Sequence, residues 1–560
     1  MLKQIKTIAA ASLLLVSTVS KAQLTISSGA VFNIQSGAFV TVQGDVTSNA
    51  DITGTGNLIL KGTANQNVNM NGNIIPNLEM DNATNATLTG NLKVGSSVLF
   101  TNGKLIMGSN TATLAVGATA TGMGASKFFE TNGTGFLRRE FTADVATATA
   151  ATLMPVGAGA DYLPVSLTNT GSTYAGASIG VQAVGTASTN KHVRTETFLL
   201  AKWPVNKTGI TGGTTNAVGT YVDPTRVIVG AGGVETDLKG IYWNGTNWSL
   251  TGGNQDAALN TVGATIATNI GELYGMNKFI LLDSKVFLQG AYNAGTGLMD
   301  DKLRNSTSPS YTTYTPGFVP GSNIIPSSDP YRTFPYNVSN FAHTNNIIPE
   351  TVTLTAFNDN TLNNDNIVDW VFLELRNTLS PGSLVLQTRS ALLQRDGDIV
   401  DIDGVSPIYF KNVDAANYVI TVRHRNHLGM SSKPTFALSL DLAVNPTKLN
   451  FSDQATIANF LGTANVNFVN NGTVNMLYAG NVNMNSGLRW LAPSSDKDYL
   501  LNSVLGGVSG TSLSNTYSVG DVNLNRGVRW LAPSSDKDYI LSTPLGGSSG
   551  TTKSQSFPLP

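Results

Sequence analysis

Oxygen-bearing side chains recur at alternate positions in two segments near the end of the 560-residue chain. Each segment has three such side chains in the order of a 1-3-5 loop, then a Gly, then a pair of acids. The two sets are Asn481, Asn483, Asn485, Asp496 and Asp498, and Asp521, Asn523, Asn525, Asp536 and Asp538. A hard cation such as Ca²⁺ takes about six to eight oxygen ligands, and alternate side chains of a tight loop can converge on one ion. The spacing therefore predicts a calcium loop in each copy.

The two sets belong to a duplication, because RWLAPSSDKDY begins at Arg489 and again, unchanged, at Arg529. We expect Trp490 and Trp530 to anchor each copy in a core. Asp521 gives the second loop one more carboxylate than the first, and ligand charge strengthens calcium binding. The alternative is a pair of Asx-turns, in which the Asn and Asp side chains bond to their own backbone.

The segments GNVNMNSGLRWLAPSSDKDYLL and GDVNLNRGVRWLAPSSDKDYIL resemble the paired calcium loops of dockerin modules. More closely, they resemble a C-terminal duplication in secreted, haemagglutinin-like surface proteins of the Bacteroidota. Segments from Gly290, Ala391 and Tyr418 are also similar to parts that precede that duplication. The resemblance implies a secreted or surface-exposed, non-catalytic multidomain protein with calcium as cofactor. Asn485 and Asn525 stand where that pattern has Asp, and an extra residue precedes the Gly, which predicts weaker binding.

The first 22 residues have the pattern of a secretory signal peptide. Lys3 and Lys6 precede an apolar run that ends at a small-x-small site, and this run is too short to span a bilayer. We therefore expect export, to the medium or the outer cell surface, and no transmembrane segment.

The composition excludes several kinds of chemistry and of binding partner. The chain has no Cys, which excludes disulfides and thiolate chemistry. Only 12% of residues are charged and the net charge is −1, so nucleic acid is not an expected partner.

Short apolar bursts between Gly, Asn, Ser and Thr predict a mainly β, multidomain array. Residues 23–124 are repetitive and predict a β-solenoid, with an ordinary sandwich as the alternative. Residues 125–284 predict a β-sandwich-like domain. Residues 285–440 predict a second one with a long N-terminal loop. Residues 441–560 would form the C-terminal module with the duplicated, EF-loop or dockerin-like repeat, after a short helix at 452–462.

The segment IYWNGTNW predicts a hairpin that turns at Asn244-Gly245 in a two-residue type I′ loop. In that register Trp243 opposes Thr246, Ile241 opposes Trp248, and both Trp side chains lie on one face. They would form either a packed core pair or an aromatic platform for sugars.

Two further clusters of polar side chains are candidates for a functional site. QRDGDIVDIDG contains Asp396, Asp398, Asp401 and Asp403. These acids could hold a cation, but a hairpin that turns at Asp396-Gly397 explains the pattern more simply.

In RHRNHLG, alternation places Arg423, Arg425 and His427 on one face and His424 on the other. We expect His424 to be a hydrogen-bonded residue at the edge of a core and the Arg pair to meet nearby Asp. The sequence has no nucleophile elbow, P-loop or HExxH motif.

The resulting hypothesis is a non-catalytic, exported surface, adhesion or structural protein with a calcium-stabilised C-terminal interaction module. Its partner would be a cell-surface or extracellular protein or polysaccharide. The first alternative is an extracellular polysaccharide-binding protein. A glycan-active enzyme, which needs two carboxylates across a cleft, is the second.

Overall fold

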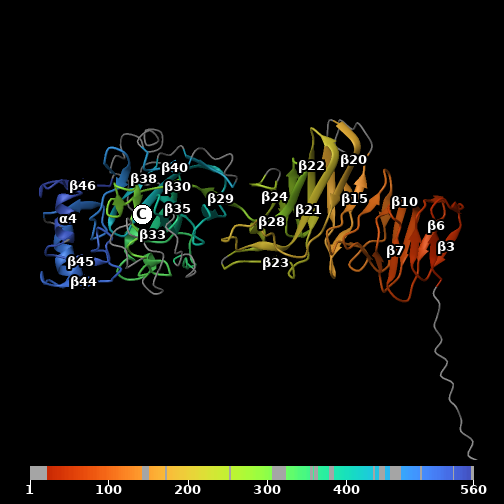
Figure 1. Cartoon of the computed structure of the whole chain (residues 1–560), viewed down its shortest axis with the longest axis horizontal. Coiled ribbons are helices and arrows are strands. Elements are labelled where there is room, and N and C mark those ends of the chain that lie inside the picture. The colour runs from red at the N-terminus through yellow and green to blue at the C-terminus, as the bar shows by residue number, and fades with distance from the viewer. Residues whose placement is uncertain are drawn as a thin grey trace, which may run out of the picture.

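The computed structural model describes residues 22–141, 151–170, 173–231, 233–250, 254–304, 323–352, 357, 364–377, 384–432, 436–440, 448–453, 468–491, 495–533 and 535–555. The predicted signal peptide, up to residue 21, and nearly all of the helix predicted at 452–462 lie outside these ranges. The described chain is an elongated, mainly β array, as Figure 1 shows. Its repetitive N-terminal region lies at one end and the duplicated tail at the other.

The N-terminal region is a β-solenoid, which confirms that prediction. Leu24, Val46, Val68 and Leu88 occupy matching positions of successive parallel strands, so the first coils take 22 residues each (46 − 24 and 68 − 46). A single coil cannot bury its own apolar side chains, and stacking places them in one continuous ladder. The strands of the first sheet are β1 (Leu24–Ile26), β4 (Val46–Ser48), β7 (Gln66–Asn69), β9 (Ala86–Leu88), β11 (Leu105–Ile106), β14 (Phe129–Glu130), β17 (Val156–Ala158) and β18 (Asp161–Tyr162).

The second sheet of the solenoid continues, without a break, into an antiparallel region. Its strand β15 pairs in parallel with β12 on one side and antiparallel with β20 on the other. The solenoid part comprises β3 (Phe39–Val42), β6 (Asn57–Leu60), β8 (Ile74–Asp81), β10 (Leu92–Asn102), β12 (Ala112–Leu114) and β15 (Leu137–Glu140), with the short strand β13 (Thr119–Thr121) beside β10. The short strands β2 (Phe32–Ile34) and β5 (Ile52–Gly54) form a separate parallel pair. The antiparallel part comprises β20 (Thr173–Val181), β21 (Phe198–Thr211), β28 (Ile270–Asn277), β24 (Leu238–Trp243), β25 (Trp248–Ser249) and β23 (Val227–Ile228).

A five-stranded antiparallel sheet covers this region. Trp203 of β21 is fully buried and donates its indole N–H to the carbonyl oxygen of Leu163 at 2.9 Å. A side chain at Gly219 would collide with the Trp203 ring, so the two layers pack closely there. The five strands are β16 (Thr152–Met154), β19 (Val165–Thr170), β22 (Thr214–Thr220), β27 (Thr261–Ile266) and β26 (Asn254–Asp256).

Residues 22–282, which we name the N-terminal unit, share one hydrophobic core. The boundary predicted at residues 124 and 125 falls inside this core. The next boundary is at strand β29 (Phe279–Leu282), where side chains alternate between two cores. Phe279 and Leu281 pack in the core of the N-terminal unit, whereas Ile280 and Leu282 pack in the following one.

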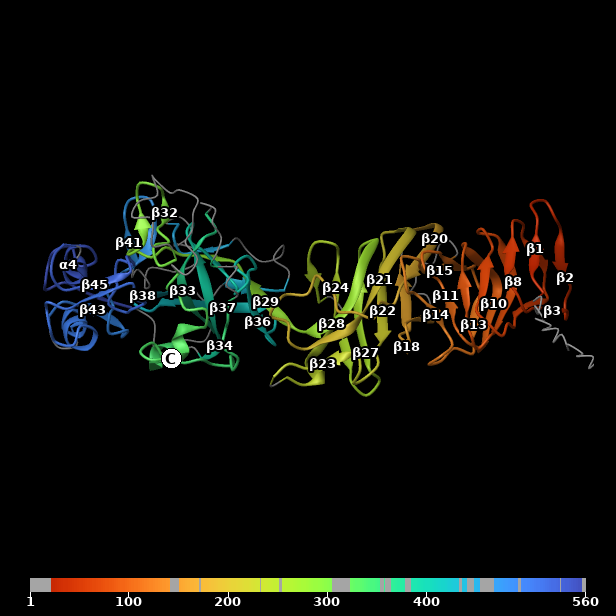
Figure 2. The ribbon, with the colours of Figure 1, turned by 60° about the horizontal axis from the view of Figure 1, so that its bottom comes forward.

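The following core extends to Leu545, and we name residues 283–555 the C-terminal unit. Its central strand β33 (Ile367–Arg376) is buried along its whole length, because the segment around Tyr331 and Phe341 covers one face. The other strands of the main sheet are β30 (Ser284–Lys285), β34 (Val385–Gln394), β35 (Asp398–Val400), β37 (Ala416–His424), β38 (His427–Ser431), β39 (Phe436–Leu438) and β40 (Leu449–Asn450). Three separate strand pairs are β31 (Tyr292–Asn293) with β32 (Leu298–Met299), β41 (Phe468–Asn470) with β42 (Asn475–Leu477), and β29 with β36 (Ile408–Lys411). Figure 2 shows the main sheet of this unit between β29 and the tail.

The two repeats of the tail exchange strands. The final strand of the second copy, β46 (Thr552–Ser554), pairs with β43 (Gly487–Arg489) of the first. The equivalent strand of the first copy, β44 (Ser512–Ser514), pairs with β45 (Gly527–Arg529) of the second. Each copy also carries a short helix, α3 (Asp496–Tyr499) followed by η5 (Leu500–Val504), or α4 (Asp536–Ser542). Neither copy is therefore complete without the other.

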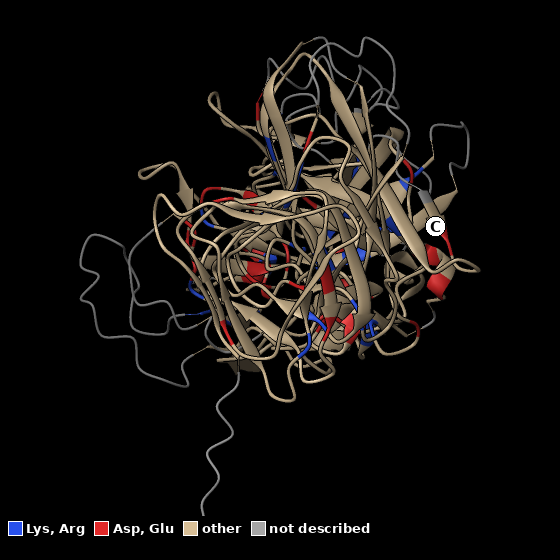
Figure 3. Ribbon diagram, turned by 90° about the vertical axis from the view of Figure 1, so that its right-hand side faces the viewer, with Lys and Arg blue, Asp and Glu red and all other residues tan. Residues whose placement is uncertain are grey.

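Charged residues are sparse along the whole chain, and Figure 3 shows Lys and Arg interspersed with Asp and Glu. None of the helices in the described part of the chain has both the length and the apolarity that a membrane span requires.

The exchanged strand allows a direct test of this topology. Deletion of residues 551–560 removes β46, which should expose the amides of β43 and cost about 1–3 kcal/mol locally, from a few hydrogen bonds. Hydrogen–deuterium exchange should show faster exchange in peptides that contain Gly487–Arg489. Peptides that contain Gly527–Arg529 are the matched control and should change little, since β44 remains. Equal loss of protection in both copies would contradict the exchanged pairing.

Candidate functional site

The second repeat buries two carboxylates close together. Asp521 and Asp536 are both 0% exposed. Asp521 accepts hydrogen bonds from the amides of Asn525 and Arg526, each at 2.8 Å. Asp536 accepts the amide of Arg529 at 2.8 Å. Burial raises the pKa of Asp521 to about 6, and burial together with the charge of Asp521 raises the pKa of Asp536 to about 8.

The first repeat has a weaker version of the same arrangement. Asp496 is 0% exposed and accepts the amide of Arg489 at 2.8 Å, and burial raises its pKa to about 7. Position 1 of this loop is Asn481 instead of an acid, and its amide nitrogen donates to the carbonyl oxygen of Asn485. The first loop therefore concentrates less negative charge than the second.

One amide oxygen in each loop is buried without a hydrogen-bond partner among the described residues: Oδ1 of Asn481 and Oδ1 of Asn523. An unpaired buried acceptor costs free energy, so each is a candidate ligand atom. The position-5 side chains differ from this pattern. Asn485 accepts the amide of Gly487 at 2.7 Å, and Asn525 accepts that of Gly527 at 3.0 Å, as in Asx-turns.

The bend of each loop does not lie at the Gly. The left-handed backbone conformation belongs to Met484 and Leu524, with φ of 57° and 53°, and to the inserted Arg526, with φ of 76°. Arg526 also donates to the carbonyl oxygens of Lys302 and Leu303, at 3.1 and 3.0 Å. The extra residue of the second loop thus ties that loop to the rest of the C-terminal unit.

The two later acids lie on the solvent side of their helices. Asp498 pairs with Lys497, and Asp538 pairs with Lys537 at 3.0 Å, with side chains 44% and 55% exposed. Asp538 lines a polar cleft of 790 Å³ together with Asn523, Asn525 and the hairpin β31–β32. Sequence reasoning missed this cleft, because nothing in the local pattern brings residues 290–302 beside the second loop.

Trp490 and Trp530 are half-buried against the core of the C-terminal unit. The ammonium group of Lys497 lies 5.9 Å from the ring centroid of Trp490 and 5.8 Å from that of Trp530. One lysine therefore contacts both copies of the identical segment, which places the two Trp side chains on neighbouring parts of the module.

The segment RHRNHLG forms a hairpin tip inside the protein. Arg425 and Asn426 connect β37 and β38 and are 0% exposed. Asn426 donates its side-chain amide to the carbonyl oxygens of Val519 and Asp521, at 3.1 and 2.7 Å. Its own carbonyl oxygen accepts the amides of Gly480 and Asn481, at 2.9 and 3.0 Å. The tip is thus inserted between the two loops and contacts both.

A buried ionic cluster supports this hairpin tip. Asp369 Oδ2 accepts Arg425 Nε and His424 Nε2, each at 3.0 Å, and Oδ1 accepts the Tyr517 hydroxyl at 2.6 Å. Burial alone would raise the pKa of Asp369, but Arg425 and His424 lower it to about 2. The predicted alternation is wrong at Arg425, because the chain turns there and brings His424 opposite His427.

The histidines of this cluster have a consistent neutral arrangement. His427 Nε2 accepts the amide of Gly290 at 3.1 Å, so its proton is on Nδ1, which lies 2.9 Å from His424 Nδ1. His424 then donates from Nε2 to Asp369. Both rings are 1% exposed, which indicates a structural role for the pair.

The acidic run 396–403 distributes its carboxylates among protein partners. The predicted hairpin is present, with the turn at Asp396-Gly397 between β34 and β35. Asp398 pairs with Lys285 and Lys448. Among the described residues, no group of three or more His, Cys, Asp or Glu side chains is arranged to hold a metal ion, so neither this run nor the tail contains such a cluster.

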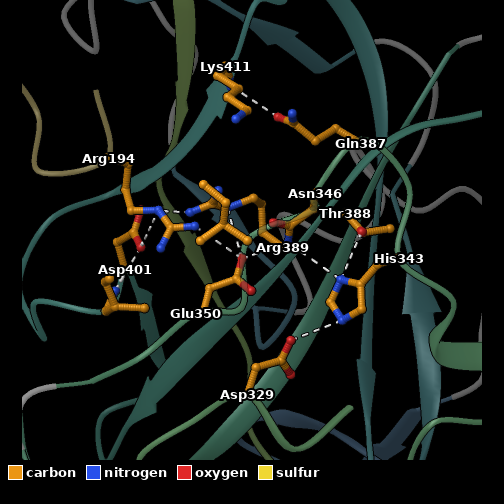
Figure 4. A network of polar contacts seen from close by, with 12 residues as sticks. Arg194, Asp329, His343, Asn346, Glu350, Gln387, Thr388, Arg389, Asp401 and Lys411 are labelled. Carbon is orange, nitrogen blue, oxygen red and sulfur yellow. Dashed lines mark hydrogen bonds and ion pairs between the residues drawn. The ribbon is translucent and has the colours of Figure 1, made fainter. Parts of the chain in front are cut away.

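A second buried network joins the two units. Arg194 of the N-terminal unit lies 3.3 Å from Glu350 and 3.9 Å from Asp401, and Arg389 lies 3.6 and 3.5 Å from the same two carboxylates. Figure 4 shows these side chains converging, with His343 and Asp329 at one side. Glu350 and Asp401 are almost completely buried, so these acids compensate buried arginines.

The Trp hairpin has a different register from the one predicted. Trp243 pairs directly with Trp248, and the loop spans four residues because the Asn244 side chain accepts the amides of Thr246 and Asn247. The two rings do share a face, with centroids 5.2 Å apart. Trp248 is 5% exposed, whereas Trp243 is half-buried.

The fold defines this chain as a mainly β protein in which a β-solenoid leads into layered sheets. Comparisons with protein-family models, with curated proteins and with solved structures find no match to it.

The ionic cluster at the hairpin tip predicts a large stability effect. The variant Asp369→Asn removes the carboxylate that is directly bonded to the buried Arg425, which should lower the free energy of unfolding by about 3–5 kcal/mol. Urea unfolding followed by Trp fluorescence measures this loss. Asp414→Asn is the matched control, since its pair with Lys278 is 76% exposed on the acid side, and it should cost at most about 1 kcal/mol. Similar losses in both variants would contradict the central role of the cluster.

The histidine pair predicts a pH effect of defined sign. Burial lowers the pKa of His427 well below 6.5, so the unfolded chain binds a proton that the folded chain does not. Above about pH 6.5 this histidine does not lower the free energy of unfolding. As the pH falls below 6.5, protonation of His427 in the unfolded chain lowers that free energy. Between about pH 7 and pH 5, His427→Gln should therefore show a smaller decrease in unfolding free energy than the parent protein. Comparison with the parent is essential, because the raised pKa values of Asp496, Asp521 and Asp536 act in the opposite direction.

Proposed function

We propose that this chain is an exported, non-catalytic surface, adhesion or structural protein whose duplicated tail binds calcium. The observation that carries the proposal is the pair of buried neighbouring carboxylates, Asp521 and Asp536. The same loop contains the buried Oδ1 of Asn523, which has no hydrogen-bond partner among the described residues. Two adjacent carboxylates in a dry site repel each other as anions. The guanidinium of Arg425 compensates part of the charge of Asp521, and a bound cation would compensate the rest.

The donor set fits a hard cation. These three residues supply carboxylate and amide oxygens, which Ca²⁺ prefers. Bound calcium would supply the positive charge that keeps both carboxylates ionised. The backbone amides around Asp521 and Asp536 fix the orientation of each carboxylate, so little reorganisation is needed on binding. Asp496 and Asn481 offer a second, weaker site in the first repeat.

A structural role agrees with the position of the module. The hairpin tip at Asn426 contacts both loops, so an ion in either loop would strengthen the attachment of the tail to the rest of the C-terminal unit. His424 and His427 are buried within this attachment. Asp300 and Asp538, two acids of the polar cleft, are each paired with a lysine. An extracellular protein or polysaccharide remains the proposed partner of the module.

Calcium titration of the chain without its predicted signal peptide tests the proposal. The isolated tail is unsuitable, because its apolar side chains belong to the same core as residues 280–451. Calorimetry should give saturable heat, and a ligand at a hundred times its Kd should add about 2.7 kcal/mol of stability per site. If calcium gives no heat, and adding or chelating it does not shift the melting temperature, the loops are Asx-turns that do not bind calcium.

Two variants locate the ion. Asp521→Ala should abolish the stronger binding event. Asn523→Ala should weaken it with little effect on stability in chelator, because its Oδ1 has no hydrogen-bond partner among the described residues. Asp414→Ala, which removes an exposed acid in the same unit, should bind calcium as the parent does. Unchanged binding in Asp521→Ala would exclude the second loop.

A further inference from the structure

A cavity of 360 Å³ opens where the N-terminal and C-terminal units meet. One wall comes from the loop at 190–193 and the Trp hairpin at 243–248, and the other from the turn at 403–407. Sites for small molecules have volumes of about 300–1,000 Å³ and occur preferentially between domains. Its position and size are therefore those of a ligand site, independent of the calcium loops.

The aromatic part of the cavity is held in place by neighbouring rings. Trp243 is half-buried and its ring centroid lies 5.2 Å from that of Trp248, which in turn lies 5.8 Å from Tyr274. The indole N–H of Trp248 donates to the carbonyl oxygen of Asn190 at 3.0 Å. These contacts fix Trp243, so presenting its ring to a ligand costs little conformational entropy.

The polar part offers groups with unused capacity. In the described part of the chain, the side-chain amides of Asn190 and Asn247 form no hydrogen bond with protein. Asp403 accepts the amides of Val405 and Ser406 on Oδ1, at 3.0 and 2.9 Å, and the Ser406 hydroxyl on Oδ2. A carboxylate oxygen has two lone pairs, so Oδ2 can accept one further O–H group.

The charges of the cavity balance. Burial would raise the pKa of Asp403, but the hydrogen bonds from Ser406 and Val405 lower it, so this carboxylate is ionised near neutral pH. Lys191 and His192 also line the cavity. Burial lowers the pKa of His192 and favours its neutral form, so Lys191 is the cation among the described lining residues. Asp403 would repel an anionic ligand, and Lys191 would repel a quaternary ammonium ligand. A neutral ligand with several hydroxyl groups avoids both repulsions.

We infer that this cavity binds one neutral pyranose residue of a polysaccharide. The apolar C–H face of the sugar would lie on Trp243, and its hydroxyl groups would bond to Asn190, Asn247 and Asp403. A purely apolar ligand would leave these polar groups unpaired, at a cost for each. The junction of the two units thereby gives an exported array a carbohydrate-binding function separate from its tail.

Saturation-transfer NMR and calorimetry with a fixed panel test the inference on the chain without its predicted signal peptide. The panel contains methyl glycosides of glucose, galactose and mannose, N-acetylglucosamine, and the β-1,4-linked trisaccharides of glucose and N-acetylglucosamine. Choline and glucuronate serve as the charged comparators. At least one neutral sugar should bind with a Kd of about 1 mM or tighter, as expected for a small, partly open site.

Variants assign the binding to the cavity. Trp243→Ala and Asn247→Ala should each weaken binding about tenfold or more. Asn247 lies in the hairpin loop, so its variant keeps the fold even if Trp243→Ala does not. Trp490→Ala removes a half-buried Trp of the tail and should bind sugar as the parent does. Absence of binding to every neutral sugar, tighter binding of choline or glucuronate, or equal binding in the Asn247 variant would overturn the inference.

Discussion

The insertion of the Arg425-Asn426 hairpin tip between the two tail loops is the interaction on which the C-terminal unit depends. Asn426 satisfies backbone groups of both copies, and Arg425 lies against Asp369 of the central strand. A buried charge without its partner is very costly, so the hairpin tip and the central strand stabilise each other. The tail adds the Tyr517 hydroxyl as a further partner of Asp369. The strand exchange between the copies adds to this constraint, because each copy supplies a strand to the other.

The same physical requirement recurs where the two units meet. Low overall charge leaves few ions on the surface, yet Arg194, Arg389, Glu350 and Asp401 are buried together at this junction (Figure 4). Each arginine lies near both acids, so no charge is left alone. The alternating side chains of β29 reinforce this junction, since one strand contributes to both cores. The cavity beside Trp243 lies next to these fixed contacts, which would hold its two walls in register.

Sequence reasoning was most successful where the physical cause is local. The solenoid follows from short apolar segments that cannot bury themselves, and the turn at Asp396-Gly397 follows from local backbone preferences. It was wrong about the Trp hairpin, because the Asn244 side chain organises a longer loop than the dipeptide Asn-Gly alone requires. It was wrong about Arg425, since strict alternation assumes a strand that continues.

By itself, the sequence determined the mainly β class, the repetitive N-terminal region and the presence of a duplicated tail with oxygen-rich loops. These properties depend on composition and on short-range periodicity, which any chain displays before it folds. Only the tertiary structure decided which acids of the tail are buried, that Asp536 lies beside Asp521 while Asp538 faces solvent, and that Trp243 borders a cavity. Burial and contacts between distant segments produce these features, and no local pattern encodes them.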